Sequence, residues 1–155
     1  MPRIGLGTSG LNKTHKDFIV KAVVEGGYRH IDTASEYGNE QMIGDAIEEI
    51  EEKGISRNDL YITTKLWMTD HRTPMRSLKK SLERLRISYV DQYLIHWPIN
   101  QFNNETGKYH RHPVYKVWAG MEECVAKNYA KSIGVSNFNF QSLADLSTHA
   151  RMSPT

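Results

Sequence analysis

The sequence has a single cysteine, no excess of charge of one sign and no long apolar run. Cys124 has no second cysteine with which to form a disulfide within the chain, which favours a reducing compartment such as the cytoplasm. The 20 basic and 18 acidic residues are interspersed and leave a net charge of +2, so we expect neither nucleic acid nor a membrane as a partner. No apolar run approaches the length of a membrane-spanning helix, and the N-terminus lacks the pattern of a secretion signal.

The remaining composition is typical of one globular domain. Apolar residues make up 39% of the 155 residues and charged residues 25%, a balance that allows a buried core, so we expect a single domain over residues 1–155. The histidines of the stretch His110-Arg111-His112 have no third metal ligand near them in the sequence. We therefore predict no metal site and a solvated loop at this position.

Strand-like and helix-like patterns alternate along the chain. Short apolar runs predict strands, and each is followed by a stretch whose apolar residues recur with helical spacing. We expect strands at residues 2–8, 28–32, 60–65, 89–96 and 130–135, and helices that begin near residues 14, 39, 73, 113 and 140. A long polar loop is expected up to about residue 112. This alternation predicts a parallel sheet with helices packed against it.

Two architectures fit such a pattern: an open doubly wound sheet and a (β/α)8 barrel. The first turn, Gly5-Leu6-Gly7-Thr8, lacks the third glycine of a dinucleotide-binding fingerprint, which weakens the doubly wound alternative. Candidate reactive groups follow several successive strands, as expected for a barrel. A closed barrel needs eight strands and about 250 residues. With five predicted strands, the chain is a fragment, has an open sheet or is completed by another chain.

The candidate reactive groups are Asp32, Tyr37, Lys65 and His96, which follow successive predicted strands about thirty residues apart. Because the carboxyl ends of parallel strands meet at one edge, we expect these side chains to lie together. A lysine ammonium beside a tyrosine favours loss of the phenolic proton, and Asp32 could hold that ammonium in place. His96 could orient a substrate oxygen. The set suits proton donation to an oxygen that gains negative charge, as in carbonyl reduction by a hydride-donating cofactor.

Each of these side chains also has a purely structural interpretation. Asp32 could cap a turn, and Tyr37 could be an ordinary half-buried loop tyrosine. Lys65 could be a solvated residue at a strand end, and His96 a core histidine whose nitrogens have hydrogen-bond partners.

Trp67 and Trp97 come just after Lys65 and His96. They could line an apolar substrate pocket or simply pack on the rim of the fold. Cys124 falls within the helix expected near residue 113, away from the strand ends, and is expected to be an inert packing residue.

Five stretches of the chain match one known family in order and spacing. They are PRIGLGT (2–8), IDTASEYGNE (31–40), ITTKLW (62–67), YVDQYLIHWP (89–98) and KSIGVSNF (131–138). Through them the whole sequence resembles the aldo-keto reductases. The resemblance implies an α/β fold of the TIM (β/α)8 barrel type, with about the first five βα units present. It also implies NADPH-dependent reduction of an aldehyde or ketone to an alcohol.

The resemblance further implies roles for individual residues. Tyr37 corresponds to the family's proton donor and Lys65 to the residue that tunes it. Asp32 corresponds to the residue that supports this lysine, and His96 to the one that orients the substrate carbonyl. The positions expected to bind the cofactor are Thr8, Asp32, Ser136 and Asn137. The positions expected to contact the substrate are Tyr37, Trp67, His96 and Trp97.

The sequence departs from the family in three ways. The family usually has a β-hairpin before the first strand, and here only Met1 precedes Pro2. Ser9 stands where many members carry a tryptophan over the substrate pocket, which implies a wider pocket. The chain ends where strand 6 would begin, and strands 6 to 8 carry most of the family's NADPH contacts. We therefore expect a truncated chain that binds NADPH weakly.

The departures leave three alternatives open: a reductase, a catalytically inactive truncated member, or a regulatory binding subunit such as some relatives of this fold provide for ion channels. Full-length relatives imply a monomer. A truncated chain with open sheet edges is expected to self-associate.

Overall fold

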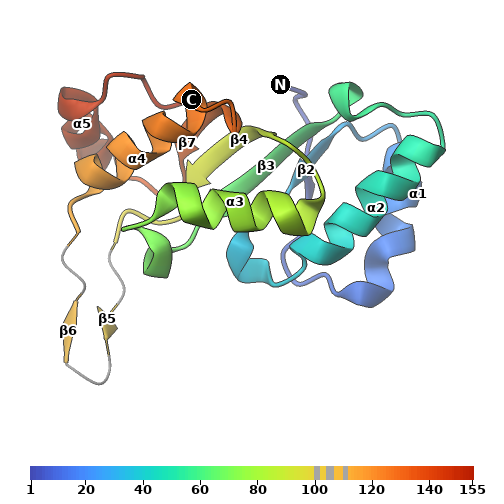
Figure 1. Ribbon diagram of the computed structural model, residues 1–155, viewed down its shortest axis with the longest axis horizontal. Helices are drawn as coiled ribbons and strands as arrows, with labels where there is room; N and C mark the ends of the chain where they lie inside the picture. The colour runs from blue at the N-terminus through green and yellow to red at the C-terminus, as the bar shows by residue number, and fades with distance from the viewer. Residues whose placement is uncertain (100–101, 104–106, 110–111) are drawn as a thin grey trace.

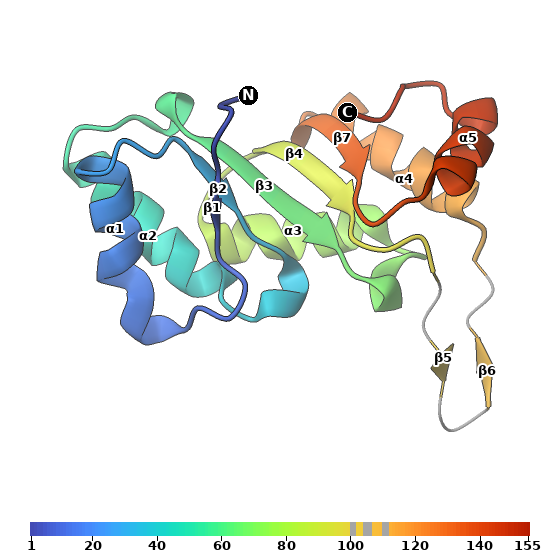
Figure 2. The ribbon, with the colours of Figure 1, turned by 180° about the vertical axis from the view of Figure 1, so that it is seen from behind.

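The computed structural model describes residues 1–99, 102–103, 107–109 and 112–155. Its main feature is a five-stranded parallel sheet, with helices packed along one face (Figures 1 and 2). The strands are β1 (Leu6–Gly7), β2 (His30–Asp32), β3 (Tyr61–Leu66), β4 (Val90–Ile95) and β7 (Ala130–Val135). The α-helices are α1 (Lys16–Val24), α2 (Glu40–Glu52), α3 (Pro74–Leu85), α4 (Val114–Ala126) and α5 (Phe140–His149).

The strand order distinguishes between the two expected architectures. The strands lie side by side as β1-β2-β3-β4-β7, and every neighbouring pair is parallel. A doubly wound sheet reverses its strand order at a switch point, whereas barrel strands follow one another around the sheet in chain order. The observed order is that of a barrel, and it brings the carboxyl ends of all these strands to one edge.

Side-chain alternation along the strands separates an apolar face from a polar one. Ile31, Ile62 and Ile133 are almost completely buried and belong to the core between the sheet and the helices. On the other face, His30 Nε2 lies 2.9 Å from Thr63 Oγ1, and Thr63 Oγ1 donates to Gln92 Oε1 at 3.3 Å. These hydrogen bonds link β2, β3 and β4 across the face that no helix covers in Figure 2.

A cluster of charges stabilises the beginning of β4. Asp91 Oδ2 accepts hydrogen bonds from the backbone N–H of Ile62 at 2.9 Å and from Arg57 Nη2 at 2.8 Å. Asp91 Oδ1 accepts from Lys131 Nζ at 3.1 Å. The Arg57 guanidinium and the Lys131 ammonium also lie 4.3 and 4.2 Å from the centre of the Tyr89 ring. This cluster ties β3, β4 and β7 together near the amino ends of β4 and β7.

Two helices pack so closely that one position must be glycine. A Cβ atom built on Gly44 of α2 would lie 2.5 Å from the backbone oxygen of Arg84 in α3. Nearby, the buried Glu40 carboxylate accepts from Arg84 Nε at 2.8 Å and from the Thr64 hydroxyl at 2.7 Å. The contacts of Glu40 join α2, α3 and β3 directly behind the carboxyl edge of the sheet.

Most predicted elements are present, but several boundaries differ. The strand predicted at 130–135 matches β7, the helix predicted to begin near residue 140 matches α5, and Pro74 occupies the first position of α3. The first helix begins later than predicted, because Asn12 caps a 3-10 turn and α1 starts only at Lys16. The predicted loop before residue 112 contains a short hairpin of β5 (Phe102–Asn103) and β6 (Lys108–Tyr109).

Cys124 lies inside α4, completely buried, and its Sγ donates to the Gly120 carbonyl at 3.3 Å. Burial raises the pKa of its thiol to about 12, so it is un-ionised at neutral pH. Within the part of the chain that the structure describes, no helix is both long and apolar enough to cross a membrane.

Candidate active site

Four of the predicted residues meet at the carboxyl edge of the sheet around the ammonium of Lys65. The Lys65 side chain is only 7% exposed and forms an ion pair with Asp32 through Nζ and Oδ1. Lys65 Nζ also donates to the Thr33 carbonyl at 2.9 Å and to the Tyr37 hydroxyl at 3.3 Å. An ammonium has three protons, and each has an acceptor here. The charge is therefore held in one place beside the tyrosine.

The chain after β2 is shaped to bring Tyr37 back towards β3. A 3-10 turn over Ser35–Tyr37 ends at Gly38, whose φ of 67° lies in the left-handed region that glycine adopts without strain. The Ser35 hydroxyl donates to the Lys65 carbonyl at 3.0 Å and fastens this turn to β3. The turn and this bond fix the backbone of Tyr37 relative to β3.

His96 completes the group from the end of β4. Its ring lies edge-on to the rings of Tyr37 and Trp67, with centroid distances of 5.7 and 5.0 Å. Burial lowers the pKa of His96, the Lys65 charge lowers it further, and the Asp32 carboxylate opposes both effects. The imidazole is therefore neutral at pH 7. Its Nδ1 is buried and has no hydrogen-bond partner among the described residues.

The predicted cofactor position Thr8 lies deeper than the other candidates. Thr8 is completely buried, and both its backbone N–H and its hydroxyl donate to the carbonyl of Asp32, at 3.0 and 3.1 Å. These bonds connect the loop after β1 to the end of β2. The Thr8 hydroxyl proton is thus used within the protein, and its oxygen can only accept a further hydrogen bond.

Ser136 and Asn137 follow β7 at the same edge. The Ser136 N–H donates to the Ile95 carbonyl at 2.9 Å. Asn137 is exposed with a φ of 61°, and its Nδ2 donates to the His96 carbonyl at 2.8 Å and to Ser136 Oγ at 3.1 Å. The Ser136 hydroxyl proton and the Asn137 amide oxygen have no partner among the described residues. The pair thus offers a donor and an acceptor next to His96.

The two tryptophans differ in exposure. Trp67 is half-buried against His96, while Trp97 is 40% exposed. Both follow strands that end at this edge, so a ligand above His96 would have an apolar wall at Trp67.

Sequence reasoning did not identify the residues that support Lys65 from behind. The Thr33 carbonyl is one of its three acceptors, and the buried Asn39 accepts a hydrogen bond from the Thr33 hydroxyl at 3.1 Å. From the sequence, Asn39 indicates only the start of a helix. The sequence signal for this residue is its place directly before a helix with an apolar face, and that signal does not indicate a contact with Thr33.

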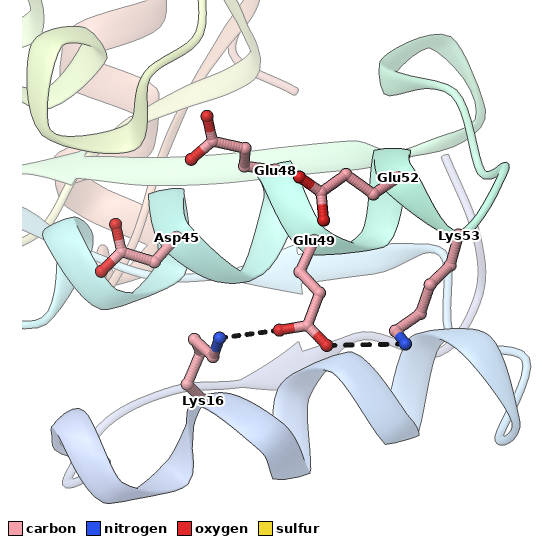
Figure 3. Close-up of a pocket in the computed structure, with 6 residues that line it drawn as sticks. All are labelled: Lys16, Asp45, Glu48, Glu49, Glu52 and Lys53. Atoms are coloured by element: carbon pink, nitrogen blue, oxygen red, sulfur yellow. Dashed lines mark hydrogen bonds and ion pairs between the residues drawn. The ribbon is translucent and has the colours of Figure 1, made fainter.

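One hollow of the surface lies away from this edge. It lies between α1 and α2 and contains its own compensating charges (Figure 3). There, Glu49 pairs with Lys16 at 2.7 Å and with Lys53 at 3.6 Å. His110 and Arg111 lie outside the described residues. Elsewhere in the described chain, no group of three or more histidine, cysteine, aspartate or glutamate side chains is arranged to hold a metal.

Comparison with known proteins gives one consistent family. Residues 3–155 match the family model described as the aldo/keto reductase family. An NAD(P)H-dependent 6'-deoxychalcone synthase from Glycine max is 40% identical over 99% of the chain and 52% of that protein. The aldose reductase of Giardia lamblia superposes with a TM-score of 0.90 at 35% identity, covering 99% of this chain and 55% of that one.

A Bombyx mori aldo-keto reductase, solved in complex with NADP, superposes with a TM-score of 0.91 at 33% identity over 99% of this chain and 52% of that one. The chain thus spans about half the length of the relatives it matches. These matches confirm the expected fold class, an α/β sheet of the (β/α)8 type.

Proposed function

The chain belongs to the aldo/keto reductase family, and we propose that it reduces an aldehyde or ketone to an alcohol with hydride from NADPH. The observation that carries the proposal is the Lys65 ammonium, which contacts both the Asp32 carboxylate and the Tyr37 hydroxyl. This arrangement places a phenolic proton beside a fixed positive charge at the edge where parallel-sheet enzymes bind their substrates.

In this proposal Tyr37 is the proton donor. As the carbonyl carbon receives hydride, its oxygen gains negative charge and takes the proton of the Tyr37 hydroxyl, which forms the alcohol. The phenolate left behind is stabilised by Lys65, 3.3 Å away. Asp32 holds Lys65 and offsets part of the cost of burying its charge. Neutral His96 donates a hydrogen bond to the same carbonyl oxygen and orients it.

The residues after β7 fit the nicotinamide end of the cofactor. NADPH, when bound, supplies the hydride. A carboxamide carries one acceptor and one donor group, and the Ser136 hydroxyl and the Asn137 amide oxygen offer the complementary pair. We assign them to the nicotinamide carboxamide, and Thr8 and Asp32 to its neighbourhood. Trp67 and Trp97 line the substrate side, which suits a small carbonyl compound with an apolar part.

The remaining parts of the proposal concern the chain as a whole. Residues 1–155 act as one domain of a (β/α)8 enzyme, and the substrate is its small-molecule partner. The single buried cysteine supports a cytoplasmic location.

Aldehyde-dependent oxidation of NADPH tests the proposal, with Tyr37→Phe as the decisive variant. Loss of the donor should lower the rate by about a hundredfold or more, since general acid catalysis contributes on that scale. Tyr115→Phe is the matched control, because Tyr115 is a 45% exposed tyrosine of α4 and should keep the full rate. Full activity in Tyr37→Phe, or no turnover by the unaltered chain at saturating NADPH, would contradict the proposal.

A further inference from the structure

Asn39 stands at the amino end of α2 but does not cap it. An asparagine at this position usually accepts a hydrogen bond from a free N–H of the first turn. Here the side chain makes no such bond to α2. Its Nδ2 donates instead to the carbonyls of Thr8, at 2.7 Å, and Leu11, at 3.1 Å. Its Oδ1 accepts from the Thr33 hydroxyl at 3.1 Å. All three bonds go to the loops after β1 and β2.

Thr33 connects Asn39 to the lysine of the site. Thr33 is completely buried, and its side chain is held by Asn39. Its backbone N–H donates to the Thr63 carbonyl at 2.9 Å, so the residue is fixed from the β3 side as well. Its carbonyl then accepts from Lys65 Nζ at 2.9 Å. One hydrogen-bonded path thus runs from Asn39 through Thr33 to Lys65.

We propose that Asn39, acting through Thr33, is a positioning residue that holds the Lys65 ammonium within reach of the Tyr37 hydroxyl. The inference rests on the proposed function, in which that ammonium assists Tyr37. The geometry leaves little tolerance. The Lys65–Tyr37 distance of 3.3 Å is already just beyond the usual range for such a hydrogen bond. A small displacement of the Thr33 carbonyl would therefore separate the lysine from the tyrosine.

The charged and titratable groups around Lys65 do not replace this support. Asp32 approaches from β2 and is half-exposed, with 39% of its side chain accessible, so it tolerates several positions of the ammonium. Tyr37 approaches from the turn after β2, and neutral His96 from the end of β4. Of the three acceptors of Lys65 Nζ, only the carbonyl of Thr33 belongs to a completely buried residue that is held from two sides, by Asn39 and by β3.

A matched pair of variants tests the path itself. Thr33→Val keeps the shape of the side chain but cannot donate to Asn39, and it leaves the bonds from Asn39 to Thr8 and Leu11 in place. Thr33→Ser keeps the hydroxyl and should behave like the unaltered chain. Asn39→Ala removes the bond to Thr33 as well as the bonds to Thr8 and Leu11. Because Asn39→Ala can also fail to fold, Thr33→Val keeps the proposal testable.

The readout is the Lys65 ammonium, observed by proton–nitrogen NMR in mildly acidic buffer at low temperature and by its rate of acetylation. We expect Thr33→Val to shift or broaden the Lys65 signal and to raise its acetylation on the order of tenfold, the scale of one hydrogen bond to a charged group. In Thr33→Ser both the Lys65 signal and its acetylation rate should equal those of the unaltered chain. Lys16, which pairs with Glu49 in the hollow of Figure 3, is the internal reference and should not change.

A Lys65 signal that is unchanged in Thr33→Val would overturn the proposal. Equal changes at Lys16 and Lys65 would also overturn it, because they would indicate that the whole domain has become less rigid. Neither readout requires turnover. An inactive chain whose Lys65 responds to Thr33→Val would therefore refute the proposed function and leave the positioning role intact.

Discussion

Replacement of Asp91 by alanine should destabilise the fold by about 3 kcal/mol. The Asp91 side chain is 7% exposed, and the Arg57 side chain that pairs with it is 13% exposed. Removing one member of a buried pair leaves the other charge uncompensated, which costs about 3–5 kcal/mol. The lower end applies here, because Arg57 would keep its bonds to the carbonyls of Leu60 and Tyr89, at 2.8 and 2.9 Å.

Two further variants divide this free energy between its sources. Lys131→Met should cost less than about 1 kcal/mol, because the Lys131 side chain is 57% exposed and its ion pair is screened by water. Asp91→Asn should cost about 2 kcal/mol, since one oxygen can still accept from the Ile62 N–H while the charge opposite Arg57 is lost. Urea unfolding followed by circular dichroism measures all three differences.

The same carboxylate makes stability depend on acid. Burial alone would raise the pKa of Asp91, but the Ile62 N–H and the Arg57 guanidinium together hold that pKa below its ordinary value. Its contribution is therefore complete above the ordinary value of about 4 and is lost as the pH falls towards the lower folded-state pKa. Asp91→Asn should lack this part of the acid destabilisation. A loss below 1 kcal/mol in Asp91→Ala, or an equal loss in Lys131→Met, would refute the reasoning.

Two other predictions concern the helix contact and the site histidine. Gly44→Ala should destabilise by about 2 kcal/mol despite alanine's better helix propensity, because its Cβ would meet backbone atoms of α3. In Gly120→Ala the atoms nearest to the new Cβ belong to the side chain of Pro74 and not to a backbone, so urea unfolding should show a smaller loss. The His96 ring should titrate by NMR below the ordinary value of about 6.5, so its contribution to stability falls as the pH drops through that value. A midpoint at or above the ordinary value would contradict the stated effect of burial.

Elements whose signals are local could be predicted well from the sequence. The strand at 130–135 and the helix that begins near residue 140 were predicted without knowledge of distant residues, and both match the structure. The strand predicted at 28–32 is shorter than expected because its first residues close the turn after α1. There the Tyr28 N–H donates to the Ala22 carbonyl and the Arg29 guanidinium to the Val23 carbonyl.

The candidate site could be predicted only in part. Asp32, Tyr37, Lys65 and His96 follow from their positions after successive strands, and the structure brings them together. The role of Asn39 could not be predicted, because its partners Thr8 and Leu11 are distant along the chain and the local pattern indicates only that a helix begins near residue 39. The charge cluster of Asp91 could not be predicted for the same reason: its partners are distant along the chain, and the run at 89–96 indicates only a strand.

The strand order has a consequence for how the chain folds. In the five-stranded sheet, β2, β3, β4 and β7 each pair with the strand of this sheet that comes before them in the sequence. No strand therefore has to wait for a much later segment before it can pair. Domains begin to fold from their amino end during synthesis, and contacts between nearby segments form fastest. The ion pair of Asp32 and Lys65 needs only β2 and β3. This ion pair can therefore form before β4 has paired with β3.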